Sequence, residues 1–228
     1  MPLAEPPTAA GSLNGHPPRT LAGTQLVRIW RRHLPDGAVR TSPWWFASAP
    51  PEPATGGRFD LPAPAGTCYL AETVAGAVLE ALQVHLANLP AAELAARGAV
   101  RTEAPTAMPP AADLTDPVGV QLGLTSSVWA GTDRPLTQRW AAAFRRDGWW
   151  ALHGGIQHDL TGVLRGVSLF DQAGEHEPTH AGPWPLDEVD LLDDQTLVEL
   201  ADAGVVVRGP GNLPPAPTPW NRPERVGS

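Results

Sequence analysis

The chain has 228 residues, 42% of them hydrophobic and 18% charged, which is enough for one domain with a sizeable core. Its net charge of −8 argues against a protein that coats nucleic acid, because neutralising phosphates needs a basic face. One cysteine, Cys68, excludes an intrachain disulfide, and no signal-like N-terminus or long apolar run is visible. These features favour a cytoplasmic protein that neither spans a membrane nor contacts nucleic acid directly.

Proline marks the expected domain boundaries. Residues 1–23 and 209–228 are rich in Pro and Gly, and we expect both to be extended or disordered tails. Residues 24–208 are expected to form one domain. Strands and helices are interspersed there without a repeated βαβ rhythm, which favours an α+β fold with a compact mixed sheet and flanking helices.

The first half of this domain reads as strand, loop, strand and helix. Residues 24–32 alternate as an opening strand does, and a long loop follows with aromatic anchors at 44–46. A strand is expected at 67–71. The helix after it is expected to start at Glu72 or Thr73 and to run to about Asn88, because a proline follows shortly. Later helices are predicted over residues 91–98, 135–148 and 193–204.

Three features resemble reactive sites, and each has a simpler explanation. Residues 176–180 fit the zinc motif H-E-x-x-H, but Pro178 inside it disfavours the helix that such a site needs. We therefore predict a solvated loop. His153 and His158 flank a Gly-rich turn, which is a weak metal signal, and we assign no metal. Cys68 is expected to fill the core.

Glu80 is the most informative single residue. It stands in the predicted helix 72–88, whose apolar stripe recurs every four positions, and small residues, Gly76 and Ala77, precede it by one turn. Burying an unpartnered carboxylate is costly and raises its pKa. Glu80 therefore points to solvent, pairs with an arginine, or faces a cavity in which a substrate supplies the partner.

The segment "GGRFDLPAPAGTCYLAETVAGAVLE" resembles the RES-domain family, toxins of bacterial toxin–antitoxin pairs that consume NAD. The family shows Gly-Gly-Arg and an aromatic residue, then a tyrosine on a strand, then a helical glutamate. Here Arg58, Tyr69 and Glu80 follow one another at intervals of 11 positions. Arg28 stands where the family often has an arginine on its first strand. The resemblance covers roughly residues 25–172.

This resemblance also has two departures. The asparagine that follows the family's aromatic residue is Asp60 here, and the family's signature serine falls at His153. Histidine can donate or accept a hydrogen bond as serine does, but it is larger and can carry charge. The substitution places an imidazole where the family has the hydroxyl that contacts phosphate or ribose.

The resemblance implies a fold similar to that of ADP-ribosyltransferases, with residues 24–208 as the catalytic domain. It implies cleavage of the nicotinamide–ribose bond of NAD, with water or inorganic phosphate as the acceptor. Glu80 would stabilise the sugar cation, Arg58 and Arg28 would bind the pyrophosphate, Tyr69 would contact nicotinamide and ribose, and His153 would contact substrate.

The implied partner is a helix-turn-helix antitoxin of the Xre type, expected to block the cleft. Two alternatives remain open. The same cleft can transfer ADP-ribose to a protein or a metabolic target, or the chain can be a catalytically impaired NAD-binding or interaction module, which His153 would favour.

Overall fold

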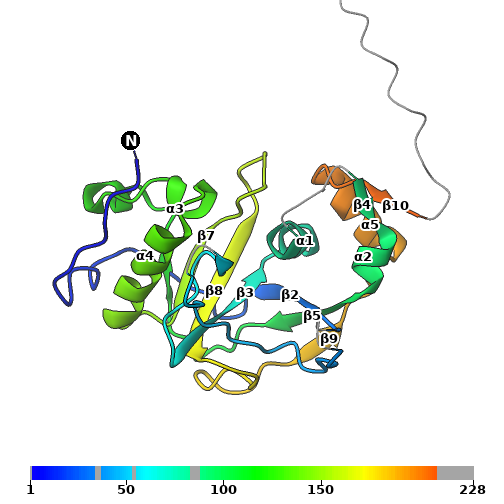
Figure 1. Cartoon of the computed structure of the whole chain (residues 1–228), viewed down its shortest axis with the longest axis horizontal. Helices are drawn as coiled ribbons and strands as arrows, with labels where there is room; N and C mark the ends of the chain where they lie inside the picture. The colour runs from blue at the N-terminus through cyan, green and yellow to red at the C-terminus, as the bar shows by residue number, and fades with distance from the viewer. Residues whose placement is uncertain (1, 34–36, 53–54, 83–87, 210–228) are drawn as a thin grey trace, which may run out of the picture.

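The computed structural model describes residues 2–33, 37–52, 55–82 and 88–209, which are organised around an eight-stranded mixed sheet (Figure 1). The strand order is β1–β6–β7–β8–β3–β2–β5–β9. Neighbours are antiparallel except β6 and β7, which are parallel. The strands span Pro18–Arg19 (β1), Gln25–Arg31 (β2), Ala65–Ala71 (β3), Arg97–Glu103 (β5), Ala111–Asp113 (β6), Ala151–Gly155 (β7), Arg165–Gln172 (β8) and Leu186–Glu188 (β9).

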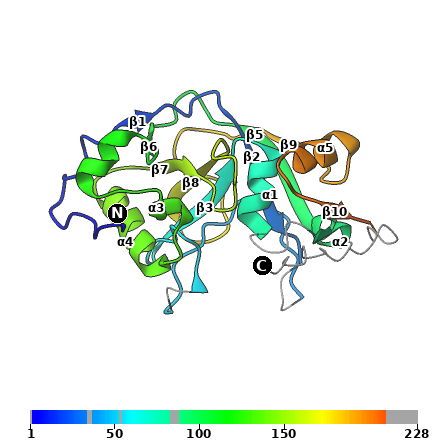
Figure 2. The same ribbon diagram turned by 90° about the horizontal axis from the view of Figure 1, so that it is seen from above.

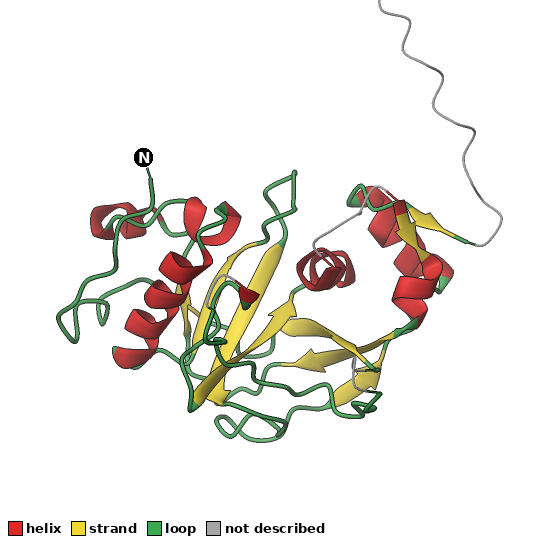
Figure 3. Ribbon diagram, in the orientation of Figure 1, coloured by secondary structure: helices red, strands yellow, loops and turns green. Residues whose placement is uncertain are grey.

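Helices cover one face of this sheet, and long loops cover the other (Figure 3). Two short strands, β4 and β10, form a separate parallel pair. The predicted α+β class with a mixed sheet and flanking helices is confirmed. The remaining elements span Val74–Leu82 (α1), Leu89–Pro90 (β4), Ala91–Ala95 (α2), Pro117–Leu122 (the 3-10 helix η3), Ser127–Ala130 (α3), Arg134–Arg146 (α4), Asp194–Asp202 (α5) and Val207–Arg208 (β10).

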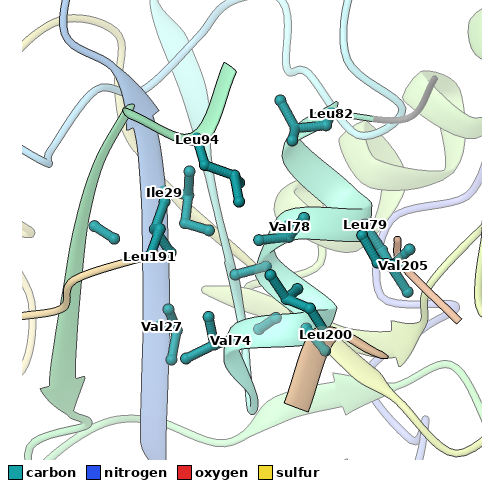
Figure 4. Packing of buried hydrophobic residues seen from close by; sticks show 14 of the residues in the cluster. Val27, Ile29, Val74, Val78, Leu79, Leu82, Leu94, Leu191, Leu200 and Val205 are labelled. Carbon is teal, nitrogen blue, oxygen red and sulfur yellow. The ribbon is translucent and has the colours of Figure 1, made fainter. Parts of the chain in front are cut away.

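Helix α1 lies over β2 and β3, between α4 on one side and α5 on the other (Figures 1 and 2). Its apolar side chains Val74 and Val78 pack against Val27 and Ile29 of β2, and Leu200 of α5 closes this core (Figure 4). A second core joins α4 to β7 and β8. Since α1 and α4 have separate cores, the sheet face between them is available for a site.

The opposite face of the sheet is closed by aromatic residues from loops. Trp44 and Phe46 are buried there with Trp184 and with Cys68 of β3. Trp44 and Phe46 thus anchor the loop as predicted and Cys68 lies in the core, whereas Trp45 is only partly buried and lies against Arg40. Residues that share this face with Cys68 point away from α1 and α4.

Element boundaries follow local signals in some places and sheet pairing in others. Asp133 and Asp193 cap α4 and α5, and their carboxylates accept hydrogen bonds from the amides of Leu136 at 2.9 Å and Thr196 at 2.7 Å. The predicted helix 72–88 is observed as α1, and residues 83–87 lie outside the described part. The helix predicted over 91–98 ends at Ala95, because the next residues form β5, which pairs with β2 over its whole length.

The segment 2–23 was expected to be a disordered tail, and the structure corrects this. Strand β1 joins the edge of the sheet, and Leu13 and Leu21 are fully buried. The indole of Trp140 in α4 donates to the Ala4 carbonyl at 2.8 Å. A proline-rich segment still has backbone carbonyls that can accept hydrogen bonds from the rest of the domain. Amino-acid composition does not show whether they do. The other predicted tail, 209–228, lies outside the described residues except for Gly209.

None of the helices in the described ranges combines the length and the apolar composition that crossing a membrane requires.

Candidate active site

The site begins where strands β2 and β3 part. Each pairs along its length with its outer neighbour, but between the two only Val27 lies opposite Ala71 in the ladder. Arg28 fills the fork: its Nη1 donates to the carbonyl of Tyr69 at 2.8 Å and its Nε to that of Pro43 at 3.1 Å. The fork is therefore held open by a guanidinium group that is bonded to main-chain oxygens.

A cavity of about 250 Å³ opens at this fork under α1. Four of the five predicted site residues line it: Arg28, Arg58, Tyr69 and Glu80. A smaller cavity of about 20 Å³ adjoins it and shares three of them. The structure thus brings together side chains that are up to 52 positions apart in the sequence (28 to 80).

Arg58 is the buried cation of the site, with 3% of its surface exposed. Its Nη1 donates to the Gly131 carbonyl, and its Nη2 donates to the side-chain oxygen of Gln157. Burial, and then the charge of Arg134, lower the pKa of Arg58 to about 10. The guanidinium therefore stays protonated at neutral pH and carries its charge to the floor of both cavities.

Tyr69 and Asp60 hold the Gly-Gly-Arg loop. The Tyr69 hydroxyl donates to Asp60 Oδ1 at 2.8 Å and accepts from the Phe59 amide at 2.8 Å. The other Asp60 oxygen accepts from the Gly57 amide at 2.6 Å. A Cβ at Gly57 would lie 2.5 Å from both the Asp60 carboxylate and the Tyr69 hydroxyl, so this position requires glycine. Burial raises the pKa of Asp60 and also that of Tyr69, the latter well above its usual value.

Glu80 is half-buried and lines both cavities from the last turns of α1. Burial raises its pKa, while the charges of Arg58 and Arg134 act in the opposite direction. Of the two small residues one turn earlier, Ala77 lines the larger cavity and Gly76 lets α1 approach Ile156, whose Cδ1 would lie 2.8 Å from a Cβ. Two of the three alternatives for this carboxylate therefore hold together, because Glu80 lines a cavity and lies within the electrostatic influence of Arg58 and Arg134.

Comparison with protein families gives a match to the RES domain over residues 26–158. The chain belongs to the RES-domain family.

Among solved structures, the chain is similar to one in the crystal structure of the M. tuberculosis MbcT–MbcA toxin–antitoxin complex. The TM-score is 0.50 at 18% sequence identity, and the match covers 83% of this chain and 90% of that one. This likeness shows a shared fold. Comparison with curated proteins found no significant match.

One predicted site residue of this RES-domain protein lies elsewhere. His153 is 2% exposed and pairs with Val167 in the ladder, on the sheet face that points away from α1 and α4. Its Nε2 lies 3.0 Å from a Glu72 oxygen and its Nδ1 lies 3.6 Å from one of Asp113. His153 lines neither cavity, so its position corrects the predicted substrate contact and gives it a structural role between two carboxylates.

A serine does line the RES-domain site, at a position that sequence reasoning missed. Ser168 of β8 is 5% exposed, lies directly opposite Tyr69 in the ladder and borders the smaller cavity with Arg58 and Glu80. The available signal was one polar residue in the apolar strand "GVSLF". Its relation to Tyr69 depends on the strand register, which the sequence pattern does not fix.

The histidines of the zinc-like motif lie outside the site. Residues 176–180 form no helix, as predicted. His176 stacks on Phe46 with ring centroids 4.8 Å apart, and His180 packs against Trp150 at 4.7 Å. Both histidines therefore help to close the loop-covered face of the sheet.

Proposed function

We propose that this RES-domain protein consumes NAD by breaking the bond between nicotinamide and ribose and passing ADP-ribose to inorganic phosphate or water. The observation that carries the proposal is the convergence of Glu80, Arg58 and Tyr69 on one cationic cavity. Arginines attract the pyrophosphate of a dinucleotide, and a carboxylate among them suits a reaction in which positive charge develops on a sugar.

The chemistry assigns the reacting groups as follows. The bond from ribose C1′ to the nicotinamide nitrogen breaks, and its electron pair leaves with neutral nicotinamide. The ribose becomes cation-like, and the Glu80 carboxylate stabilises it. An oxygen of the phosphate dianion then adds to C1′ and gives ADP-ribose phosphate. With water as the acceptor, the water oxygen adds to C1′ and one proton is released to solvent. The Tyr69 hydroxyl is occupied by Asp60 and Phe59, so we assign its ring, rather than its hydroxyl, to contact with substrate.

The test is NAD loss and nicotinamide release by the purified protein, with and without inorganic phosphate. We expect Glu80→Gln to lower turnover by at least about a hundredfold, the usual scale for losing one preorganised electrostatic group. Glu188→Gln, an exposed glutamate of β9, is the matched control. A phosphate requirement identifies phosphorolysis. Equal turnover in wild type and Glu80→Gln would contradict the assignment.

The same assay separates the alternatives. Label that moves from NAD to a protein identifies an ADP-ribosyltransferase, and NAD binding without turnover identifies an impaired binding module.

We also propose that the protein acts as a cytoplasmic toxin neutralised by an antitoxin, of helix-turn-helix type, that covers the cavity. The RES-domain family and the fold shared with a chain of a toxin–antitoxin complex support this. Expression of the wild type is expected to stop bacterial growth, and Glu80→Gln is expected to permit it. Growth that is equally slow with both proteins would count against toxicity by NAD loss.

A further inference from the structure

The larger cavity carries more positive charge than the proposed reaction uses. Of the described residues that line it, five are arginines and one, Glu80, is a carboxylate. Two of them, Arg28 and Arg58, are bonded to protein acceptors. The other three arginines that line the cavity are Arg31, Arg40 and Arg97.

Arg31 and Arg97 are held together by the sheet. They lie directly opposite each other where β2 pairs with β5. Like charges in that relation destabilise a sheet. Glu93 approaches Arg97 at 3.7 Å and offsets part of the charge. The pKa of Arg97 is nevertheless lowered, first by burial and then by Arg31. An anion between the two guanidinium groups would remove this repulsion.

Arg40, from the loop that follows β2, lines the same cavity. Its backbone amide donates to the Arg32 carbonyl at 2.8 Å, and its guanidinium lies 4.3 Å from the centre of the Trp45 ring. The Nε atom is buried and has no hydrogen-bond acceptor within the described ranges. A buried donor without an acceptor is costly. The loop therefore fixes Arg40 in a position that an anionic ligand would complete.

The cavity is too small to enclose a whole dinucleotide. Pockets that enclose a drug-sized ligand measure about 300–1,000 Å³, and this cavity measures about 250 Å³. A dinucleotide whose pyrophosphate meets Arg28 and Arg58 would extend past the mouth. The part of the dinucleotide that lies beyond its pyrophosphate, or a second reactant, would then meet Arg31, Arg40 and Arg97.

We propose that Arg31, Arg40 and Arg97 form a subsite for a phosphate dianion in the larger cavity, beside Arg28 and Arg58. The inference rests on the proposed function in taking that phosphate to belong to the dinucleotide or to react with it. Two sources share this chemistry: a third phosphate carried by a phosphorylated nicotinamide dinucleotide, and free phosphate that enters as the acceptor. The three arginines present charge-assisted donors to either one.

The first test measures binding of inorganic phosphate to the full chain by calorimetry. Arg40→Gln and Arg97→Gln are each expected to weaken it by about tenfold, the loss of one charge-assisted interaction. Arg101→Gln is the matched control, because Arg101 lies on the same strand, four positions beyond Arg97, and does not line the cavity. Arg40→Lys, which keeps the charge, is expected to retain most of the binding. Unchanged phosphate binding in both glutamine variants, with unchanged melting temperatures, overturns the subsite.

Measurements of KM for NAD, NADP and phosphate identify the source of the phosphate. If the dianion belongs to the dinucleotide, NADP is used at lower KM than NAD, and Arg40→Gln and Arg97→Gln abolish that preference. If it is the acceptor, the two variants raise the KM for phosphate during NAD turnover. Turnover of NAD with neither effect overturns the subsite and leaves the proposed function intact. Arginine-dependent phosphate binding without turnover of either dinucleotide contradicts the proposed function and supports the subsite.

Discussion

Asp60 and Glu80 are carboxyl groups of one site with different surroundings. Asp60 accepts hydrogen bonds from Tyr69 and Gly57, so its oxygens hold the loop that carries Arg58. Glu80 borders the open volume of both cavities. Burial raises the pKa of each. Asp60 is therefore a positioning residue, and Glu80 is the carboxylate that can meet a substrate.

The raised pKa of Glu80 predicts that this residue reduces stability at neutral pH. An acid whose folded-state pKa lies above its unfolded value costs stability once pH exceeds the unfolded value, because the fold resists ionisation. We expect Glu80→Gln to melt higher than wild type at pH 7, and the difference to disappear below about pH 4.5, the usual pKa. Melting curves at both pH values check this. A variant that melts lower at pH 7 would show that the arginines outweigh burial.

Tyr69→Phe tests the hydroxyl apart from the ring. The substitution leaves Oδ1 of buried Asp60 without the Tyr69 donor and the Phe59 amide without its acceptor, while Oδ2 of Asp60 keeps the Gly57 amide. We expect a loss of about 1–3 kcal/mol in the free energy of unfolding, measured by urea denaturation. NAD turnover is expected to fall less than in Tyr69→Ala, which also removes the ring. Full stability in Tyr69→Phe would show that the hydroxyl does not hold the loop.

At the scale of elements, α4 is covered by the N-terminal segment rather than by solvent. Arg146 donates to the carbonyls of residues 7–9, and Trp149 donates to the Leu13 carbonyl at 3.0 Å. Asp147, just beyond the helix, accepts from the Leu13 amide at 2.9 Å. The helix end and the segment thus stabilise each other through the backbone.

Asp147→Asn is expected to weaken this attachment. Hydrogen bonds, first of all from Arg146, lower the pKa of Asp147 to about 2, so its contribution is present above the usual 3.8 and is lost as pH falls through about 2. We expect a loss of about 1–2 kcal/mol at pH 7 that shrinks between pH 4 and 2, with faster proteolysis of residues 2–23. Asp187→Asn, on the exposed strand β9, is the control. Equal proteolysis in the two variants would contradict the attachment.

Local pattern was sufficient for the elements that carry the site but not for their orientation. The resemblance to the RES-domain family, carried by the spacing of Arg58, Tyr69 and Glu80, identifies three residues that line one cavity and belong to a loop, a strand and the next helix. His153 was misplaced because one step along a strand reverses the face of the sheet. Ser168 depends on the register between β3 and β8, which no local signal contains.

At the scale of the whole molecule, the matched family region, residues 26–158, leaves out a central strand of the sheet and a helix of the core. Strand β8 begins after residue 158, yet it lies between β7 and β3 and pairs with both. Helix α5, also beyond that limit, closes the core of α1. The site therefore depends on chain that follows the recognised domain.

A chain limited to residues 26–158 is accordingly expected not to fold. Loss of β8 would separate β7 from β3 and expose the apolar residues of two cores. Circular dichroism and urea denaturation should show no cooperative transition, whereas residues 2–209 should unfold in one. A cooperative transition in the shorter chain would show that β8 is dispensable.

Arg28 and Arg58 are held mainly by main-chain carbonyl oxygens, those of Pro43, Tyr69 and Gly131, and by one side chain, Gln157. Every residue type supplies a carbonyl, so positions 43 and 131 can change identity during evolution without removing the acceptor. Selection is then expected to preserve the path of the backbone and the arginines themselves, while the neighbouring residues can be substituted. A site built this way tolerates extensive change in the sequence around it.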